Sequence, residues 1–305
     1  MTTALFALSE SELELLPSDE DMRFYQECGW YLSKKLFSDD EVETLLTESE
    51  RFYAGHRDHT LPVHPPHIAY WTPEKGDVQR HNDYIHYEIE AVRRILTKPL
   101  IGAVAARLAG VKLIRVFQST LIYKPPRPDE QSNIVPWHFD KHYWSTSTSD
   151  RMLTAFIPFH DCDEQMGTIT MVDGSHMWQE INADDSVTRH FADRDRSELE
   201  DMLIENARHN GTEAVRKVPM VIPLGHMSFH HCRTYHGSGP NRSTQPRRAI
   251  SLHLQDGDNQ WRRYPLFDGS VLTYNHDHVV RRNDDGNPDY ADPQFCPVLW
   301  EEQTA

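Results

Sequence analysis

Hydrophobic residues in the first third of the chain recur at helical spacing. Ser38, with Glu41 three residues later, has the pattern of a capping box, which predicts that a helix begins there. The apolar residues that follow it recur with a period near 3.6 residues: Val42, Leu45, Leu46, Phe52 and Tyr53. A second helix is expected from about Asp83 to Ala109, with Gly110 as its stop. The proline- and histidine-rich residues 56–82 between the two helices are expected to form a loop.

From Val111 onward the pattern changes to short apolar or alternating runs that are broken by proline and glycine. Runs of this kind predict β-strands, and we expect them at residues 113–124, 153–159, 168–172, 217–222, 226–230 and 248–255. Many short strands after a helical segment are typical of a barrel or a two-sheet jelly roll with helices packed outside. The pattern therefore predicts a mainly β fold with flanking helices, a cupin-like double-stranded β-helix.

The 305 residues are expected to form a single domain with three parts. Residues 18–110 would be the helical part, residues 111–256 the jelly-roll core, and residues 257–305 a C-terminal segment that wraps the outside. Within the core, residues 177–216 form an acidic insert, which is long for a plain connection and helical at about 197–207. We expect this insert to act as a lid over the barrel.

The charge and the cysteines narrow the class of protein. The net charge of −16 argues against a nucleic-acid or membrane partner, which would need a basic surface, and no stretch approaches the eighteen apolar residues of a membrane span. The four cysteines lie far apart, so a disulfide framework is not expected, and the N-terminus lacks the features of a signal peptide. These features predict a reduced, cytoplasmic protein that acts on a small molecule, and they leave its oligomeric state open.

Two short segments about a hundred residues apart contain potential metal ligands. His138 and Asp140 are two residues apart, so on a strand their side chains point to the same face. His236 follows near the end of a later predicted strand. Two imidazoles and one carboxylate suit a non-haem Fe(II) centre with open coordination positions, whereas a closed zinc site would need a fourth protein ligand. The alternative is coincidence, because a chain with nineteen histidines contains His-x-Asp triplets by chance.

Further landmarks give these segments a context. A helical opening at 24–37 is followed by Tyr123-Lys124-Pro125-Pro126, then His138-Phe139-Asp140, then 167–176 with its Gly-Ser-His, then 236–251. In this order the sequence resembles the phytanoyl-CoA dioxygenase (PhyH) family of Fe(II)- and 2-oxoglutarate-dependent oxygenases. The resemblance implies that Fe(II), 2-oxoglutarate and O2 are used and that the iron ligands are His138, Asp140 and His236. Asp173 departs from the family, which usually has proline there, but aspartate also suits a turn.

The resemblance also implies a binding site for 2-oxoglutarate. Arg247 matches the position whose planar guanidinium binds the distal carboxylate, and Ser238 matches a hydroxyl that bonds the same group. Lys124 and Gln118 lie on one face of their strand and could reach the cosubstrate, and Phe156 matches an aromatic lining of the pocket. Gln118 and Phe156 have equally plausible roles as an ordinary sheet residue and a core residue.

The reaction type depends on Asp140. Related halogenases have a small residue in place of this carboxylate, which opens a site for chloride. The carboxylate in this chain therefore favours hydroxylation, or an outcome derived from it such as desaturation or ring formation, with release of succinate and CO2.

The substrate is the least specified part of the prediction. The residues expected to face it are Tyr143, Trp144, Thr154, Arg233 and Trp261. An aromatic and polar mixture suits a small polar metabolite, such as one from secondary metabolism, better than a long acyl chain. Two alternatives remain: a non-catalytic jelly-roll binding or sensing module, and an acyl-CoA hydroxylase of the same family. A zinc hydrolase is disfavoured, since no helical His-x-x-x-His spacing provides its ligands and base.

Overall fold

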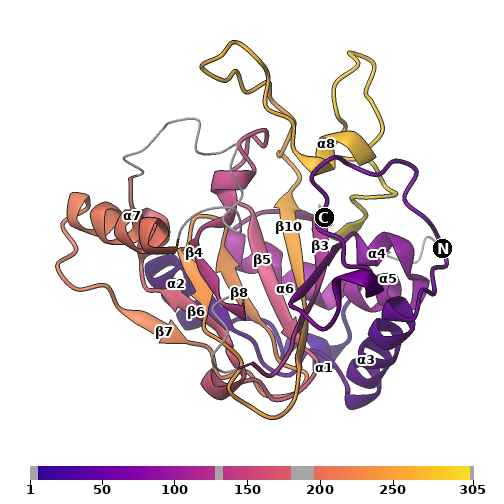
Figure 1. The fold of residues 1–305 in the computed structure, drawn as a ribbon, viewed down its shortest axis with the longest axis horizontal. Helices are drawn as coiled ribbons and strands as arrows, with labels where there is room; N and C mark the ends of the chain where they lie inside the picture. The colour runs from indigo at the N-terminus through magenta and orange to yellow at the C-terminus, as the bar shows by residue number, and fades with distance from the viewer. Residues whose placement is uncertain (1–5, 128–132, 180–195, 303–305) are drawn as a thin grey trace.

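The computed structural model describes residues 6–127, 133–179 and 196–302 (Figure 1). Its larger sheet is antiparallel and has the strand order β1-β8-β5-β10-β3-β11, with β2 also paired to β3. The bounds of these strands are Trp30–Leu32 for β1, Arg80–Asp83 for β2, Leu113–Lys124 for β3, Leu153–Pro158 for β5, Ser228–His231 for β8, Arg247–Asp256 for β10 and Val298–Glu301 for β11.

A smaller antiparallel sheet has the strand order β4-β9-β6-β7. Its strands are β4 (Val135–His138), β6 (Ile169–Val172), β7 (Lys217–Pro219) and β9 (His236–Ser238). The two sheets confirm the predicted jelly roll, and each of the six expected runs contains a strand. One run was predicted too long, because after Pro219 only Ile222 pairs again, in an isolated bridge with Cys162.

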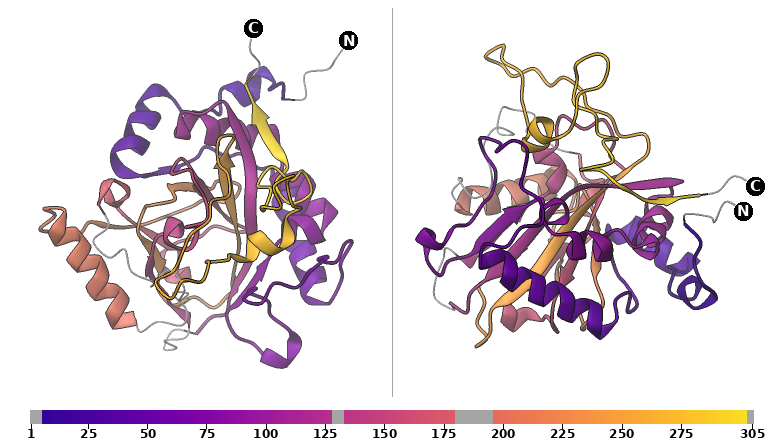
Figure 2. Two further views of the ribbon diagram at one scale, coloured as in Figure 1. Left: turned by 90° about the horizontal axis from the view of Figure 1, so that it is seen from above. Right: turned by 90° about the vertical axis from the view of Figure 1, so that its right-hand side faces the viewer.

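Helices cover the outside of both sheets (Figure 2). In the described N-terminal part these are α1 (Glu10–Leu13), α2 (Asp19–Cys28), α3 (Asp39–Tyr53), α4 (Ile85–Glu88), α5 (Glu90–Leu96) and α6 (Pro99–Ala109). The start of α3 confirms the predicted capping box: Ser38 Oγ accepts a hydrogen bond from the Glu41 amide at 3.2 Å, and the Glu41 carboxylate accepts one from the Ser38 amide at 2.9 Å. The helix α7 (Arg196–His209) confirms the expected helix in the insert, and it packs against β4 on the side of the molecule away from α3. Residues 180–195 of the expected lid lie outside the described residues.

The single helix predicted from Asp83 to Ala109 was wrong, because this segment forms the three helices α4, α5 and α6. The first break is at Ile89, whose backbone is extended (φ −127°, ψ 114°). The second is at Lys98, which precedes Pro99 and is also extended (φ −60°, ψ 132°), as a residue before proline tends to be. The predicted stop is confirmed, since Gly110 ends α6 in the left-handed conformation (φ 65°).

The main hydrophobic core lies between these helices and the outer face of the larger sheet. Side chains from α3, α5 and α6 pack there against alternate residues of the central strands, including Val116, Ile157, Ile250 and Leu252. The opposite faces of the same strands point between the two sheets and carry polar residues. Because side chains alternate along a strand, one strand can contribute to the core and to a polar interior at once.

The C-terminal segment does more than wrap the outside. Its last strand, β11, extends the larger sheet by pairing with β3, and α8 (Asn275–Val279) lies at one end of the sheets, where the loops beside it project (Figures 1 and 2). The ring of His276 in α8 lies 4.4 Å from that of Phe117. Within the described ranges no helix is long and apolar enough to cross a membrane.

Candidate metal and cosubstrate site

The predicted metal ligands come together between the two sheets. β4 and β9 pair so that His138 lies directly opposite His236, and their ring centroids are 4.2 Å apart. Asp140 follows two residues after His138, in the first turn of a short 3-10 helix (Asp140–Tyr143). One ligand atom from each of the three residues lies within 4.8 Å of the other two, and all three side chains are buried. Among the described residues, no other cluster of this kind is found.

Backbone carbonyls orient both imidazoles. Nδ1 of His138 lies 2.8 Å from the carbonyl oxygen of Pro136, and Nδ1 of His236 lies 2.9 Å from that of Thr234. A carbonyl oxygen only accepts, so each Nδ1 carries the hydrogen and each Nε2 keeps its lone pair. This tautomer is the one a metal-binding histidine needs. The donor set of two Nε2 atoms and a carboxylate fits an iron(II) ion that keeps positions open for a cosubstrate and O2.

Asp140 is held in its ionised form. Burial alone would raise the pKa of its carboxyl, but the imidazoles of His236, His230 and His253 outweigh burial and hold that pKa well below its usual value. Burial lowers the pKa of His230 and of His253 to about 4. The Thr154 hydroxyl donates to Asp140 Oδ2 at 2.6 Å. The site is therefore a preformed anionic ligand set with a polar shell around its carboxylate.

Two cations lie side by side at the other end of the same interior face. Lys124 on β3 and Arg247 on β10 are direct register partners, and their residues are 0% and 2% exposed. Lys124 Nζ donates to Ser238 Oγ at 2.6 Å and to the Gly239 carbonyl at 2.7 Å. This arrangement brings three of the predicted cosubstrate residues, Lys124, Ser238 and Arg247, into one buried cluster.

The guanidinium of Arg247 is only partly satisfied by the protein. One nitrogen donates to the Gly167 carbonyl, the group lies 5.2 Å from the ring centre of Phe156, and Nε has no hydrogen-bond partner among the described residues. Its neighbour Arg248 points to the other side of the sheet, where it pairs with Glu50 of α3 at 3.2 Å. Phe156 therefore also belongs to the pocket around Arg247, on the face predicted for it.

No carboxylate of the described residues pairs with either Lys124 or Arg247. Burial lowers the pKa of both groups, and Arg247 lowers that of Lys124 further. Two buried cations without an anion are unfavourable, since the effective penalty is several kcal/mol per ion. A dicarboxylate ligand would supply the missing charge and accept hydrogen bonds from Lys124, Ser238 and Arg247, so these residues fit 2-oxoglutarate.

Gln118 lies apart from this pocket. It is six residues from Lys124 along β3, which corresponds to about 20 Å, and it is paired with His253 of β10. Its Oε1 accepts a hydrogen bond from the hydroxyl of Tyr274, which precedes α8. Gln118 shares the interior face with Lys124, as expected, but the structure brings it to the iron end rather than to the two cations.

The residues expected to face the substrate fall into three places. Tyr143 lies beside the metal site, with its ring centre 6.3 Å from that of His138, and Thr154 contacts Asp140. Trp144 is buried against Phe117 at 5.3 Å, and Trp261 packs against the same hydrophobic cluster. This cluster closes the end of the larger sheet beneath α8.

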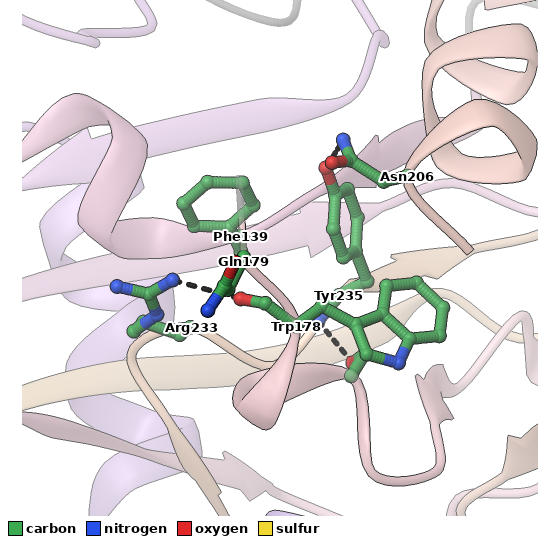
Figure 3. A pocket seen from close by; sticks show the side chains of 7 residues that line it. Phe139, Trp178, Gln179, Asn206, Arg233 and Tyr235 are labelled. Atoms are coloured by element: carbon green, nitrogen blue, oxygen red, sulfur yellow. Dashed lines mark hydrogen bonds between the residues drawn. The ribbon is translucent and has the colours of Figure 1, made fainter. Parts of the chain in front are cut away.

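Arg233 lies on the other side of the strands that carry the ligands. It donates to the Trp178 carbonyl at 2.9 Å and lines a small pocket there (Figure 3). Phe139 and Tyr235 are neighbours of the metal ligands in the sequence, and their side chains reach this pocket. Its lining consists of Phe139, Ser175, Trp178, Gln179, Asn206, Arg233 and Tyr235. The rings of Phe139 and Tyr235, 5.0 Å apart, line this pocket together with Arg233.

Sequence reasoning missed His230, His253 and Tyr274. His253 is six residues from Arg247 on the same strand, so period-two alternation could have placed it on the interior face. His230 ended a predicted strand, but the pairing of β8 with β5, which sets it opposite Thr154, is not visible in a single sequence.

Comparisons with known proteins agree with this geometry. The model of the family described as phytanoyl-CoA dioxygenase (PhyH) matches residues 25–249. The chain is 25% identical to the peroxisomal phytanoyl-CoA dioxygenase of Bos taurus over 248 residues, which cover 78% of this chain and 68% of the relative. It is 26% identical to a probable alpha-ketoglutarate-dependent hypophosphite dioxygenase of Stutzerimonas stutzeri over 246 residues, covering 78% and 79%.

Solved structures share the fold. The alpha-ketoglutarate-dependent epimerase SnoN from nogalamycin biosynthesis superposes with a TM-score of 0.64 at 21% identity, covering 92% of this chain and 98% of SnoN. EctD from S. alaskensis, solved with 2-oxoglutarate and 5-hydroxyectoine, superposes with a TM-score of 0.61 at 20% identity, covering 85% and 82%.

Proposed function

Since the chain belongs to the phytanoyl-CoA dioxygenase family and is an Fe(II)- and 2-oxoglutarate-dependent dioxygenase, we propose that it hydroxylates an unactivated C–H bond of a small polar metabolite. The observation that carries this proposal is the combination of a complete ligand set, His138, Asp140 and His236, with two buried cations, Lys124 and Arg247, that pair with no carboxylate of the described residues. A binding or sensing module would have no need for both.

Two groups of residues have different roles in the proposed reaction, one in binding the cosubstrate and one in binding the metal. The bound iron and cosubstrate supply the oxidising chemistry, and the protein supplies binding, orientation and exclusion of water. Lys124, Ser238 and Arg247 bind and orient the dicarboxylate from one end of the interior. His138, Asp140 and His236 would hold the metal at the other end of the interior. Hydrogen bonds from Nδ1 of His138 and His236 to backbone carbonyls already orient their two rings.

The carboxylate of Asp140 supports hydroxylation over halogenation. It occupies the ligand position that the resemblance associates with a small residue in halogenases, and the position therefore has no room for chloride. Hydroxylation, or an outcome derived from it such as desaturation or ring formation, is the reaction type proposed.

Polar side chains near the metal support a polar substrate. On the interior face of β3 at the iron end, Gln118 bonds the Tyr274 hydroxyl, and Thr120 donates to Asp83 at 2.7 Å. A long acyl chain would require an apolar wall in their place. Relatives at similar identity carry names as different as hypophosphite and ectoine dioxygenase, so membership of the family does not by itself select an acyl-CoA. A tailoring step in secondary metabolism is the setting we propose.

Product analysis tests the proposal. The protein is loaded anaerobically with Fe(II) and 2-oxoglutarate and then exposed to O2 with panels of small polar metabolites and of acyl-CoA thioesters. The expected result is succinate formed in step with a product that has gained one oxygen atom, from the polar panel only, and no product from Asp140→Ala. Turnover confined to the thioesters, or a halogenated product in chloride buffer, would contradict it.

A further inference from the structure

We propose that Thr154 is a positioning residue that turns Asp140 so that it binds the metal through Oδ1 alone. Thr154 was expected to face the substrate, but its hydroxyl lies 2.6 Å from Asp140 Oδ2. The other oxygen, Oδ1, faces the ligand His236, at 3.7 Å from its Nε2. The inference concerns the metal site and goes beyond the proposed function, because it does not depend on which substrate is oxidised.

The direction of the hydrogen bonds follows from the single hydroxyl proton of Thr154. The same Oγ1 atom lies 2.8 Å from His253 Nδ1. An ionised carboxylate can only accept, so Thr154 donates its one proton to Asp140 and must accept from His253, whose Nδ1 therefore carries a hydrogen. The result is a one-way chain from His253 through Thr154 to Oδ2, in which each bond orients the next group.

A second contact confines the same oxygen. Nε2 of His230, a fully buried imidazole, lies 3.4 Å from Asp140 Oδ2. The His230 ring packs beside that of His236, with centroids 4.3 Å apart, so it has no room to swing away. Oδ2 is thus held between a hydroxyl and an imidazole on the side away from Oδ1.

The orientation of Asp140 determines how many coordination positions of the metal stay open. A carboxylate can bind a metal through one oxygen or two, and a second bound oxygen would occupy a position that the cosubstrate or O2 needs. Thr154, 1% exposed and fixed on the central strand β5, removes that competitor by engaging Oδ2. Support of a ligand from the surrounding shell typically changes metal affinity or activity by 10- to 100-fold.

The test measures binding without any substrate. Fe(II) affinity of the apoprotein and 2-oxoglutarate affinity of the Fe(II)-loaded protein, read from the visible charge-transfer band under anaerobic conditions, are compared for wild type, Thr154→Val and Thr154→Ser. Thr146→Val is the matched control, since Thr146 is also fully buried and its hydroxyl bonds Tyr290 at 2.7 Å, away from the metal ligands.

A split between the two affinities is expected. Thr154→Val should weaken 2-oxoglutarate binding about 10-fold and shift the band, while Fe(II) affinity changes by less than about threefold, because the freed oxygen can itself bind the metal. Thr154→Ser should restore both readouts, and Thr146→Val should leave both unchanged. Equal losses of both affinities, or wild-type values for both in Thr154→Val, would overturn the inference. Neither result depends on substrate turnover, so a failure here is distinct from a failure of the proposed function.

Discussion

The interior face of the jelly roll carries opposite charges at its two ends, and the ends differ in how those charges are compensated. At the iron end, the anion Asp140 is surrounded by imidazoles and by the Thr154 hydroxyl, so the protein itself satisfies it. At the other end, Lys124 and Arg247 are buried together, and within the described ranges their hydrogen bonds go only to hydroxyl and carbonyl oxygens. The first site is preformed, whereas the second depends on its ligand for charge balance.

This difference shows how one fold can store binding energy. Desolvating a cation is unfavourable in the ligand-free protein, and the same absence of water strengthens its attraction to an anion that arrives later. Variants at the two ends should therefore have effects of different kinds. Loss of Asp140 at the iron end should weaken metal binding, whereas loss of Lys124 at the cationic end should raise stability and lower the affinity for 2-oxoglutarate.

The largest effect is expected at the anionic end. Asp140→Ala removes the only charged ligand of the metal set, so Fe(II) affinity should fall by more than about 100-fold, beyond the effect of losing a supporting residue. Metal content after Fe(II) loading and gel filtration, with circular dichroism to verify folding, measures this. Retention of one iron per chain would show that another carboxylate serves as the ligand.

Substitution of Arg247 is the most direct test of 2-oxoglutarate binding at the cationic end. Arg247→Met removes a guanidinium placed for two charge-assisted hydrogen bonds, so 2-oxoglutarate affinity should fall roughly 100-fold, equivalent to about 3 kcal/mol. Arg248→Met is the matched control, because Arg248 is the next residue on β10 and faces Glu50 on the outer side. Isothermal titration of both Fe(II)-loaded variants gives the comparison, and equal losses would refute the assignment of Arg247.

Substitution of Lys124 should change the stability of the protein and its affinity for 2-oxoglutarate in opposite directions. In Lys124→Met a buried unpaired charge is replaced by an apolar chain of similar length, so the ligand-free protein should gain about 1–3 kcal/mol in free energy of unfolding. Affinity for 2-oxoglutarate should fall about 10-fold, since a charged hydrogen-bond donor is lost. Urea unfolding with and without 2-oxoglutarate measures both effects. A lower free energy of unfolding in the ligand-free variant would show that the buried Lys124 does not destabilise the fold.

The smallest effect is a pH dependence of the ligand-free protein. The pKa of Lys124 is lowered well below its ordinary value by burial and by Arg247. Between the lowered pKa and the unfolded value of about 10.4, the unfolded chain binds more protons, so stability should rise with pH by up to about 1.4 kcal/mol per unit. Thermal unfolding from neutral to alkaline pH should show this rise in wild type and not in Lys124→Met. An equal slope in both proteins would assign it to other groups.

The jelly roll and the pair His138 and Asp140 were predictable from local signals, and the resemblance to the family added His236. His138 and Asp140 are two residues apart, and the capping box at Ser38 and the apolar runs of the strands are periodic patterns within a few residues. Helix boundaries failed where two local signals competed, as at Lys98, where helical periodicity continued through a residue that precedes proline.

Roles that depend on neighbouring strands were not accessible in this way. Thr154 has a polar interior position by alternation alone, yet only the pairing of β5 with β8 and β10 sets it between Asp140, His230 and His253.

The sequence by itself indicated the class of fold, because its short apolar runs are local patterns, and its resemblance to the family implied the donor set for iron and the cations for 2-oxoglutarate. Only the tertiary structure decided that Lys124 and Arg247 lie side by side with no carboxylate of the described residues paired to either, that Gln118 lies at the opposite end, and that the Thr154 hydroxyl contacts Asp140. The physical reason is register. Hydrogen bonds between strands distant in sequence fix which side chains meet, and a shift of one residue would turn each of them to the other face.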